Sequence, residues 1–130
     1  MLIVLDASAV VELLVGTVSP EVVRMVFDPK QSLHAPHLLD IEVGQVLRRW
    51  CARGLVTPAR AADALSDLAD LPLERHPHRL LWERIWALRH KLTAYDAVYV
   101  ALAEQLEAPL LTRDRRIAAA SGHLARVILV

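Results

Sequence analysis

The sequence predicts an α/β fold in which an open, mostly parallel sheet carries helices on both faces. Short runs of β-favouring residues alternate along the chain with longer segments whose apolar residues recur at helical spacing, the order produced by strands joined through helices. The first run, Leu2 to Leu5, is continuously apolar, as in strands buried on both faces. Because 130 residues suit one core, we expect a single domain over residues 1–130.

Capping signals mark the helices of the first half of the chain. Ser19 followed by Pro20, and Thr57 followed by Pro58, each combine a favoured N-cap residue with proline at the first helical position. Gly54 is placed to end the helix before it. Together with apolar residues at helical spacing, these signals predict helices at about 8–14, 20–27, 36–53 and 58–71.

The second half of the chain continues the alternation. Thr93 is a favoured N-cap residue for a helix that runs to about Leu106. Two further helices are predicted at about 81–88 and 115–120. The strands that separate the helices, together with a weak one in the first half, are predicted at about 32–35, 73–76, 109–112 and 126–130.

Composition excludes several classes of protein. The lone Cys51 rules out an internal disulfide and a cysteine zinc cluster, which fits a reducing compartment. The longest unbroken apolar stretches, 2–5 and 7–11, are far too short to span a membrane. Asp6 and Glu12 interrupt the region where a secretory signal needs an uncharged run. Fifteen basic and 15 acidic side chains cancel, so the net charge does not indicate a nucleic-acid binder. From the missing signal and membrane segments we expect a cytoplasmic protein with no membrane association.

Two carboxylates follow predicted strands directly. Asp6 comes after the strand at 2–5, and Asp114 comes after Leu110 to Thr112. Open α/β sheets place their ligand crevice outside the carboxyl ends of the strands, so both residues are candidates for a functional site. Each is also a favoured N-cap for the helix that follows it, and local sequence leaves both roles open.

Two more acids stand among apolar residues of predicted helices. Asp96 sits on or beside the apolar face of its helix, and a buried, unpaired carboxylate costs several kcal/mol, roughly, unless a cation compensates it. A metal ion is one such cation, and pairing with an arginine such as Arg89 is the structural alternative. Glu42 lies between apolar neighbours one turn away, with solvation on the helix flank as its alternative. Gly44, inside the same helix, suggests that a backbone or ligand approaches closely.

If these four acids lie close together in the folded chain, they can bind a metal ion. Carboxylate ligands without cysteine or a closely spaced histidine pair suit Mg²⁺ or Mn²⁺ rather than zinc. Such ions leave positions for water and substrate phosphate, activate the water and stabilise a leaving oxygen, which favours cleavage of a phosphodiester bond. Ser8 and Thr112 each stand two residues from a proposed ligand and are candidates to orient it, with local backbone hydrogen bonds as the alternative.

Four segments resemble the successive motifs of PIN-domain ribonucleases, and the small size resembles the VapC-type toxins of toxin–antitoxin pairs. These segments are LIVLDASAV at 2–10, residues 35–49 with Glu42, LTAYDAVYVALA at 92–103 and LLTRD at 110–114. The resemblance implies a three-layer α/β/α fold, hydrolysis of RNA dependent on Mg²⁺ with Mn²⁺ able to substitute, a homodimer, and inhibition by a cognate antitoxin. By position it assigns catalytic and metal-binding roles to Asp6, Glu42, Asp96 and Asp114, with Ser8 and Thr112 as catalytic polar neighbours.

Basic residues for RNA are expected close to Asp114. Arg113, Arg115 and Arg116 surround it in sequence, and arginine suits contacts to phosphate and stacking on bases. Many PIN-domain proteins carry a further acid shortly after this position. Because arginines follow here instead, we expect one tightly held ion, with a second present mainly when substrate phosphate is bound.

Other residues receive structural interpretations. The scattered histidines are interpreted as surface residues rather than metal ligands, because they lack the spacing of a zinc site. Trp50, Trp82 and Trp86 are interpreted as core or dimer surface rather than RNA-stacking groups. Apolar stripes, at Val10, Val11 and Leu14 and at Leu65 and Leu68, are expected to leave surface for a partner.

Two other functions are compatible with a chain of this size and fold class. A phosphate-receiver signalling domain has a similar size and fold, but it needs an aspartate after its middle strand, where this chain has His76 and Pro77. A catalytically silent PIN module that serves as an interaction partner is the closer alternative to a ribonuclease. Cleavage of RNA in the presence of Mg²⁺ distinguishes the enzyme from the silent module.

Overall fold

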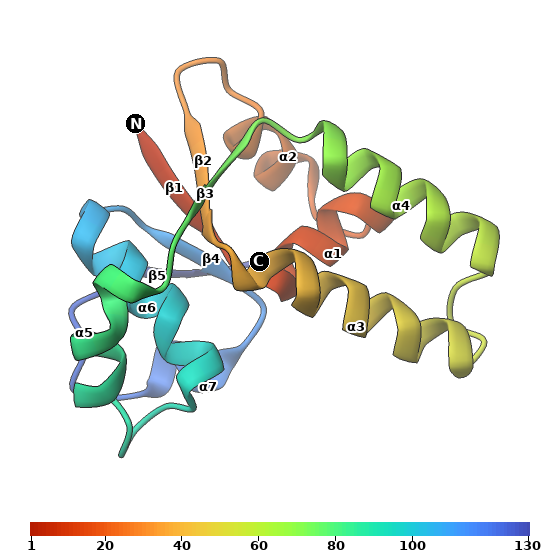
Figure 1. The fold of residues 1–130 in the computed structure, drawn as a ribbon. Coiled ribbons are helices and arrows are strands. Elements are labelled where there is room, and N and C mark those ends of the chain that lie inside the picture. The colour runs from red at the N-terminus through yellow and green to blue at the C-terminus, as the bar shows by residue number, and fades with distance from the viewer.

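A five-stranded, entirely parallel sheet forms the centre of the molecule (Figure 1). The computed structural model describes residues 1–130. The strands are β1 (Leu2–Leu5), β2 (Ser32–Pro36), β3 (Leu73–His76), β4 (Leu110–Thr112) and β5 (Val127–Leu129). They lie in the order β3-β2-β1-β4-β5, so the predicted mostly parallel sheet is confirmed and the weak strands at 32–35 and 73–76 are real.

Helices cover both faces of the sheet, as predicted. They are α1 (Ala7–Val15), α2 (Pro20–Val26), α3 (Leu38–Ala52), α4 (Pro58–Asp70), α5 (Trp82–Ala87), α6 (Ala94–Leu106) and α7 (Arg115–Ala119), with a 3-10 turn η1 at Arg79–Leu81. In Figure 1, α1 to α4 lie on one side of the sheet and α5 to α7 on the other, while α3 and α4 extend away from it as an arm. No helix combines the length and the apolar composition needed to cross a membrane.

The strand order places a crevice beside the first strand. From β1 the chain moves to β2 and β3 on one side, then returns to add β4 and β5 on the other. The order therefore reverses between β1 and β4, which pair through Val4 with Leu110 and Leu5 with Leu111. Ligands of open α/β sheets bind at such a reversal, and Asp6 and Asp114 follow the two strands concerned.

The capping signals in the sequence work as expected. Ser19, Thr57 and Thr93 each accept a hydrogen bond from a backbone amide in the first turn of their helix. Gly16 caps α1 with a φ of 79°, a left-handed conformation that glycine adopts without steric cost. Gly16 fixes the end of α1 and Thr93 fixes the start of α6, so these caps help to place the side chains that the two helices carry.

Helix α6 is the central element of the core. Every residue from Ala97 to Ala103 is buried, which is the pattern of a helix surrounded by protein rather than lying on its surface. Trp82 and Trp86 are 56% and 58% exposed, so of the two positions predicted for them, core or dimer surface, the core is excluded. Trp50 is partly buried and packs against the core.

Gly44 does not mark a close approach of another part of the backbone. A methyl group built at its Cα meets no protein atom within 4 Å, so this part of the prediction from its helix-interior position is wrong. We expect Gly44→Ala to raise the free energy of unfolding by about 1 kcal/mol, because alanine is the better helix former. Urea denaturation of the two proteins measures this change. A destabilised variant would show that the site is tighter than the structure indicates.

Candidate active site

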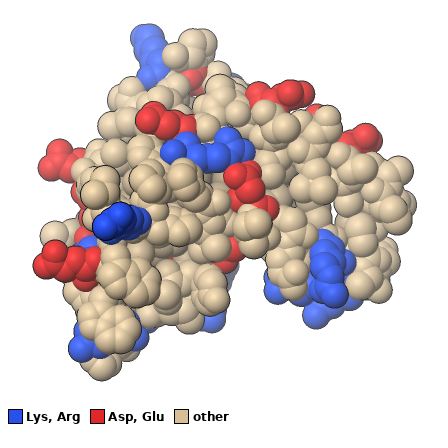
Figure 2. Space-filling view, in the orientation of Figure 1, with Lys and Arg blue, Asp and Glu red and all other residues tan.

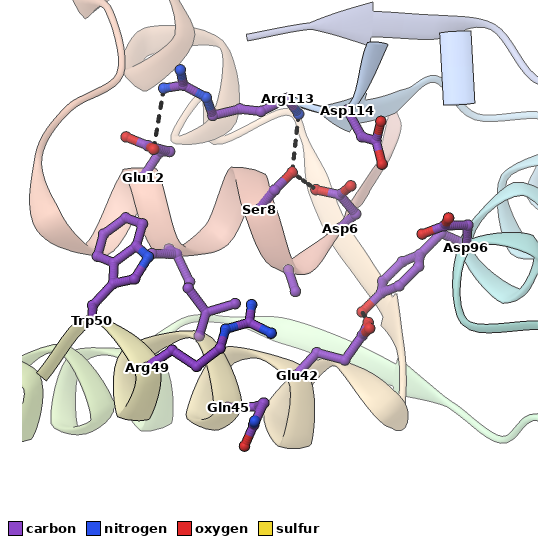
Figure 3. Close-up of a pocket in the computed structure, with 14 residues that line it drawn as sticks. Asp6, Ser8, Glu12, Glu42, Gln45, Arg49, Trp50, Asp96, Arg113 and Asp114 are labelled. Atoms are coloured by element: carbon purple, nitrogen blue, oxygen red, sulfur yellow. Dashed lines mark hydrogen bonds and ion pairs between the residues drawn. The ribbon is translucent and has the colours of Figure 1, made fainter. Parts of the chain in front are cut away.

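A cavity of about 330 Å³ opens at the carboxyl ends of β1 and β4 (Figure 3). It lies where the strand order reverses and where α1, α3 and α6 meet. All four predicted acids contribute to its wall. The residues that line it are Asp6, Ala7, Ser8, Val11, Glu12, Glu42, Gln45, Val46, Arg49, Trp50, Asp96, Tyr99, Arg113 and Asp114.

Asp6 occupies both of the positions that the sequence left open, because it caps α1 and also lies in the wall of the cavity. Its Oδ1 accepts hydrogen bonds from the Ala9 amide at 2.9 Å and from the Ser8 hydroxyl at 2.7 Å, and the first of these caps α1. The Thr112 hydroxyl donates to its Oδ2. Although 5% exposed, Asp6 still lines the cavity. The cap and the hydroxyls therefore hold one carboxylate at a fixed place in the wall.

Thr112 and Ser8 link the two strand ends. The fully buried Thr112 hydroxyl accepts a hydrogen bond from the Asp114 amide at 2.9 Å, and the Ser8 hydroxyl accepts one from the Arg113 amide at 3.0 Å. Ser8 lines the cavity and Thr112 lies behind it. Thr112 is therefore placed to position Asp6 and the loop after β4, rather than to contact a ligand.

Glu42 enters the cavity from α3 and is oriented by Tyr99. The Tyr99 hydroxyl donates to Glu42 Oε1 at 2.5 Å, which joins α3 to α6 across the cavity wall. Burial raises the pKa of Glu42, and the charges of Asp96 and Asp6 raise it further, while the Tyr99 hydrogen bond acts in the opposite direction. Glu42 is therefore half-buried in the cavity wall, and the alternative of a solvated position on the helix flank is wrong.

Asp96 lies in the first turn of α6, where the helix dipole favours a negative charge. It is half-buried rather than placed on the apolar face, and its backbone amide donates to the N-cap Thr93. Arg89, the example given for a pairing arginine, stacks over the Trp86 ring at 4.8 Å instead. The charge of Arg116 acts on Asp96 and lowers its pKa, but the two side chains do not form an ion pair. Asp96 therefore faces the cavity with no ion pair.

Asp114 is held by the arginine that follows it. Its carboxylate caps α7 by accepting the Arg116 amide hydrogen bond and also binds the Arg116 guanidinium, at 3.1 and 2.7 Å. These hydrogen bonds lower the pKa of Asp114. Asp114 is therefore charged at neutral pH. Both of its carboxylate oxygens already accept hydrogen bonds from the Arg116 side chain.

The other three predicted acids, Asp6, Glu42 and Asp96, have raised pKa values. Burial is the main cause of the raised pKa values of Asp6, Glu42 and Asp96. The charge of Asp114 raises the pKa of Asp6 and of Asp96 further. None of the three forms an ion pair. The cavity thus gathers negative charge that a cation would compensate.

Basic groups surround the cavity unevenly. Arg113 lines it and pairs with Glu12 at 3.2 Å, whereas Arg115 is exposed outside it. On the face shown in Figure 2, Lys and Arg side chains gather over α3, whose exposed Arg49 also lines the cavity. The mouth of the cavity is therefore bordered by guanidinium groups suited to phosphate.

Sequence reasoning missed several residues of the wall. Gln45 and Arg49 follow Glu42 by three and seven positions, so they share its face of α3. Tyr99 follows Asp96 by three, and Glu12 follows Ser8 by four. Helical periodicity counted from each predicted site residue would have found these residues.

The donor set of the cavity fits a hard divalent cation. Its acidic ligands are carboxylates, and no histidine or cysteine lines it, which favours Mg²⁺ or Mn²⁺ over zinc. No three of the four acids bring ligand oxygens within 4.8 Å of one another. That spacing suits an ion such as Mg²⁺, which keeps several of its water ligands.

Comparisons with known proteins agree with this geometry. The family model of the PIN domain matches residues 3–122. The chain is 45% identical over 129 residues to a protein of Mycobacterium tuberculosis named Ribonuclease VapC1, with 98% of this chain and 96% of the relative covered.

Solved structures share the fold. PAE2754 from Pyrobaculum aerophilum superposes with a TM-score of 0.70 at 26% identity, covering 95% of this chain and 87% of that one. A chain from VapBC-5 of Mycobacterium tuberculosis, described as a member of the VapBC family of toxin-antitoxin systems, gives a TM-score of 0.60 at 22% identity. That match covers 99% of this chain and 97% of the other.

Proposed function

Because the chain belongs to the PIN-domain family, we propose that it is a metal-dependent ribonuclease that acts as the toxin of a toxin–antitoxin pair. The observation that carries this proposal is the convergence of Asp6, Glu42, Asp96 and Asp114 on one cavity at the strand-order reversal. The 45% identity to a relative named as a VapC ribonuclease supports the reaction and the biological role.

The four carboxylates would hold Mg²⁺, for which Mn²⁺ can substitute. When bound, such an ion activates water and stabilises the charge that develops on a cleaved phosphodiester. Asp6 supplies a ligand oxygen fixed by the α1 cap, and Glu42 supplies one oriented by Tyr99. Asp96 adds a carboxylate to the cavity wall from α6, and Asp114 adds one from the loop after β4.

The polar and basic neighbours have separate roles in this proposal. Ser8 and Thr112 position Asp6 and the loop after β4 through their hydroxyls. Arg113, Arg115 and Arg116 bind RNA phosphates beside the cavity. Because Arg116 already holds Asp114, an RNA phosphate that binds Arg116 would free this carboxylate for a cation, in keeping with a second ion that depends on substrate.

Protein partners complete the proposal. We propose a cytoplasmic homodimer that a cognate antitoxin inhibits. Most of the apolar stripes predicted to face a partner are covered: Val10, Val11, Leu14 and Leu68 are buried, because α1 packs against α3 and α4. Leu65 is the exception, at 44% exposed. The exposed apolar residues closest in sequence to the site acids are instead Ile41 and Tyr95, 73% and 64% exposed.

Incubation of the purified chain with RNA tests the ribonuclease assignment. We expect cleavage with Mg²⁺ or Mn²⁺, loss of cleavage with EDTA, and recovery when the cation is restored in excess. An RNase inhibitor directed at metal-independent enzymes controls for contamination. Intact RNA under every condition would contradict the enzyme and support the silent interaction module.

Stabilisation by Mg²⁺ is expected to increase as the pH rises from about 5 to about 8. Asp6, Glu42 and Asp96 have raised pKa values in the folded chain. In their protonated forms these three groups stabilise the folded state. This contribution is complete below the unfolded pKa of about 4 and is lost as the pH rises through the folded pKa. A bound cation offsets this loss, by about 2.7 kcal/mol at a hundredfold excess over Kd.

Thermal melts at both pH values, in EDTA and in Mg²⁺, measure this effect. Burial lowers the pKa of His34, which adds stability as the pH rises, but it does so equally with and without Mg²⁺. Asp114 has a lowered pKa and loses its contribution only as the pH falls below about 4. A midpoint shift no larger than that of NaCl at matched ionic strength would argue against a shared cation site.

A further inference from the structure

Three side chains of metal-binding type lie together outside the cavity, on strands β2 and β3. His34, Glu74 and His76 each bring one ligand atom within 4.8 Å of the others. Parallel pairing aligns His34 with Glu74 and Pro36 with His76. Alternate residues of a strand share a face, so all three side chains project from the same face of the sheet. None of them lines the carboxylate cavity.

The distances between these atoms are close to those around a tetrahedral zinc ion. Zinc bonds of about 2.0–2.1 Å place neighbouring tetrahedral ligands about 3.3–3.4 Å apart. His34 Nδ1 is 3.5 Å from Glu74 Oε2 and 2.8 Å from His76 Nε2. The carboxylate is therefore already at ligand separation from His34, and the two imidazoles need to part by only about half an ångström.

His34 is held in the orientation that a ligand needs. Its side chain is 5% exposed, and its Nε2 lies 2.9 Å from the Ser32 hydroxyl. A hydrogen bond to the second ring nitrogen is what fixes the tautomer and ring of a metal-binding histidine. The Glu74 side chain is 67% exposed, so it can adjust to an ion with little cost in packing.

We propose that His34, Glu74 and His76 form a binding site for Zn²⁺ or a related first-row transition metal, with water as a fourth ligand. Two imidazoles and one carboxylate suit these ions, whereas Mg²⁺ prefers oxygen ligands. The scattered spacing in the sequence hid this cluster because its members come from two strands.

The position of the site indicates what the ion would do. β3 is an edge strand that pairs only with β2, and an ion held by both strands would fasten this edge. The His76 carbonyl accepts a hydrogen bond from the His37 amide, directly before α3, the helix that carries Glu42. The bound ion would therefore stabilise the edge of the sheet and the start of α3.

Calorimetric titration with Zn²⁺ tests the site in the full chain, with Mg²⁺ present in excess to compete at the carboxylate cavity. We expect one Zn²⁺ to bind, and His76→Gln and Glu74→Gln each to weaken binding by more than about tenfold. His90→Gln is the matched control, because His90 is exposed and lies outside the cluster. Circular dichroism verifies that each variant is folded.

Cobalt provides a second measurement that does not depend on nuclease activity. Co²⁺ bound here is expected to show the visible absorption of a tetrahedral ion, and Glu74→Gln, which changes an exposed side chain, is expected to remove it. Unchanged Zn²⁺ affinity in both cluster variants would overturn the proposal, as would Zn²⁺ binding that Asp6→Asn abolishes and His76→Gln leaves intact. Neither result would affect the ribonuclease assignment.

Discussion

Asp96→Asn is expected to lower RNA cleavage by roughly a hundredfold or more while the protein stays folded. Loss even of groups that only orient the ligands of a metal reduces activity by about 10- to 100-fold, and Asp96 is proposed as a ligand itself. Burial and the charge of Asp114 raise the pKa of Asp96, so its ionised form opposes folding when no cation is bound. Asparagine removes that charge, and the metal-free variant should melt at or above the temperature of the parent chain.

Single-turnover cleavage assays and melts in EDTA measure the two effects side by side. Asp63→Asn is the matched control, since Asp63 is exposed on α4 and lies outside the cavity. Activity and stability should change in opposite directions only in Asp96→Asn. If this variant unfolds, Asp96 has a structural role and its assignment to the active site is wrong.

Co-expression with the protein of the adjacent gene is expected to give a complex that does not cleave RNA. The cavity holds three carboxylates without ion pairs, and an arginine or lysine of a partner would neutralise them and occupy the space of the reactive water. A partner bound with a Kd of about 1 nM leaves about 3% of a 1 μM complex dissociated. Cleavage should therefore fall roughly thirtyfold or more.

Size-exclusion chromatography with light scattering, combined with cleavage assays on the same fractions, measures this effect. The chain alone should elute as an active homodimer, and the complex as a larger, silent species that regains activity when the partner is digested. A chain that stays monomeric and cleaves RNA regardless of the neighbouring protein would retain the ribonuclease assignment and contradict the toxin–antitoxin role.

The backbone of this protein was largely predictable because its signals are local. The continuous apolar run of β1 reports a strand buried on both faces, and the caps at Ser19, Thr57 and Thr93 report the helix starts. The acids stood out for a related reason, since Asp6 and Asp114 directly follow strands. Local sequence could not decide between capping and ligand binding, and Asp6 is placed for both.

Features that depend on long-range packing could not be predicted in the same way. The stripe at Val10 and Val11 was expected to face a partner, but the arm formed by α3 and α4 covers it. Similarly, Arg84 binds Glu104 at 2.7 Å and the Gly122 carbonyl at 2.9 Å, although 20 and 38 positions separate these residues in the sequence. Such pairs form between residues that the sequence does not place near one another.

The hydrogen bond from Thr112 to Asp6 joins residues 106 positions apart, and this separation matters while the chain is being translated. A growing chain can form β1 to β3 and α1 to α6, yet it has no complete cavity until β4 leaves the ribosome and inserts beside β1. The site therefore appears only near the end of synthesis. For most of its synthesis the nascent chain lacks Asp114, one of the four carboxylates that line the cavity.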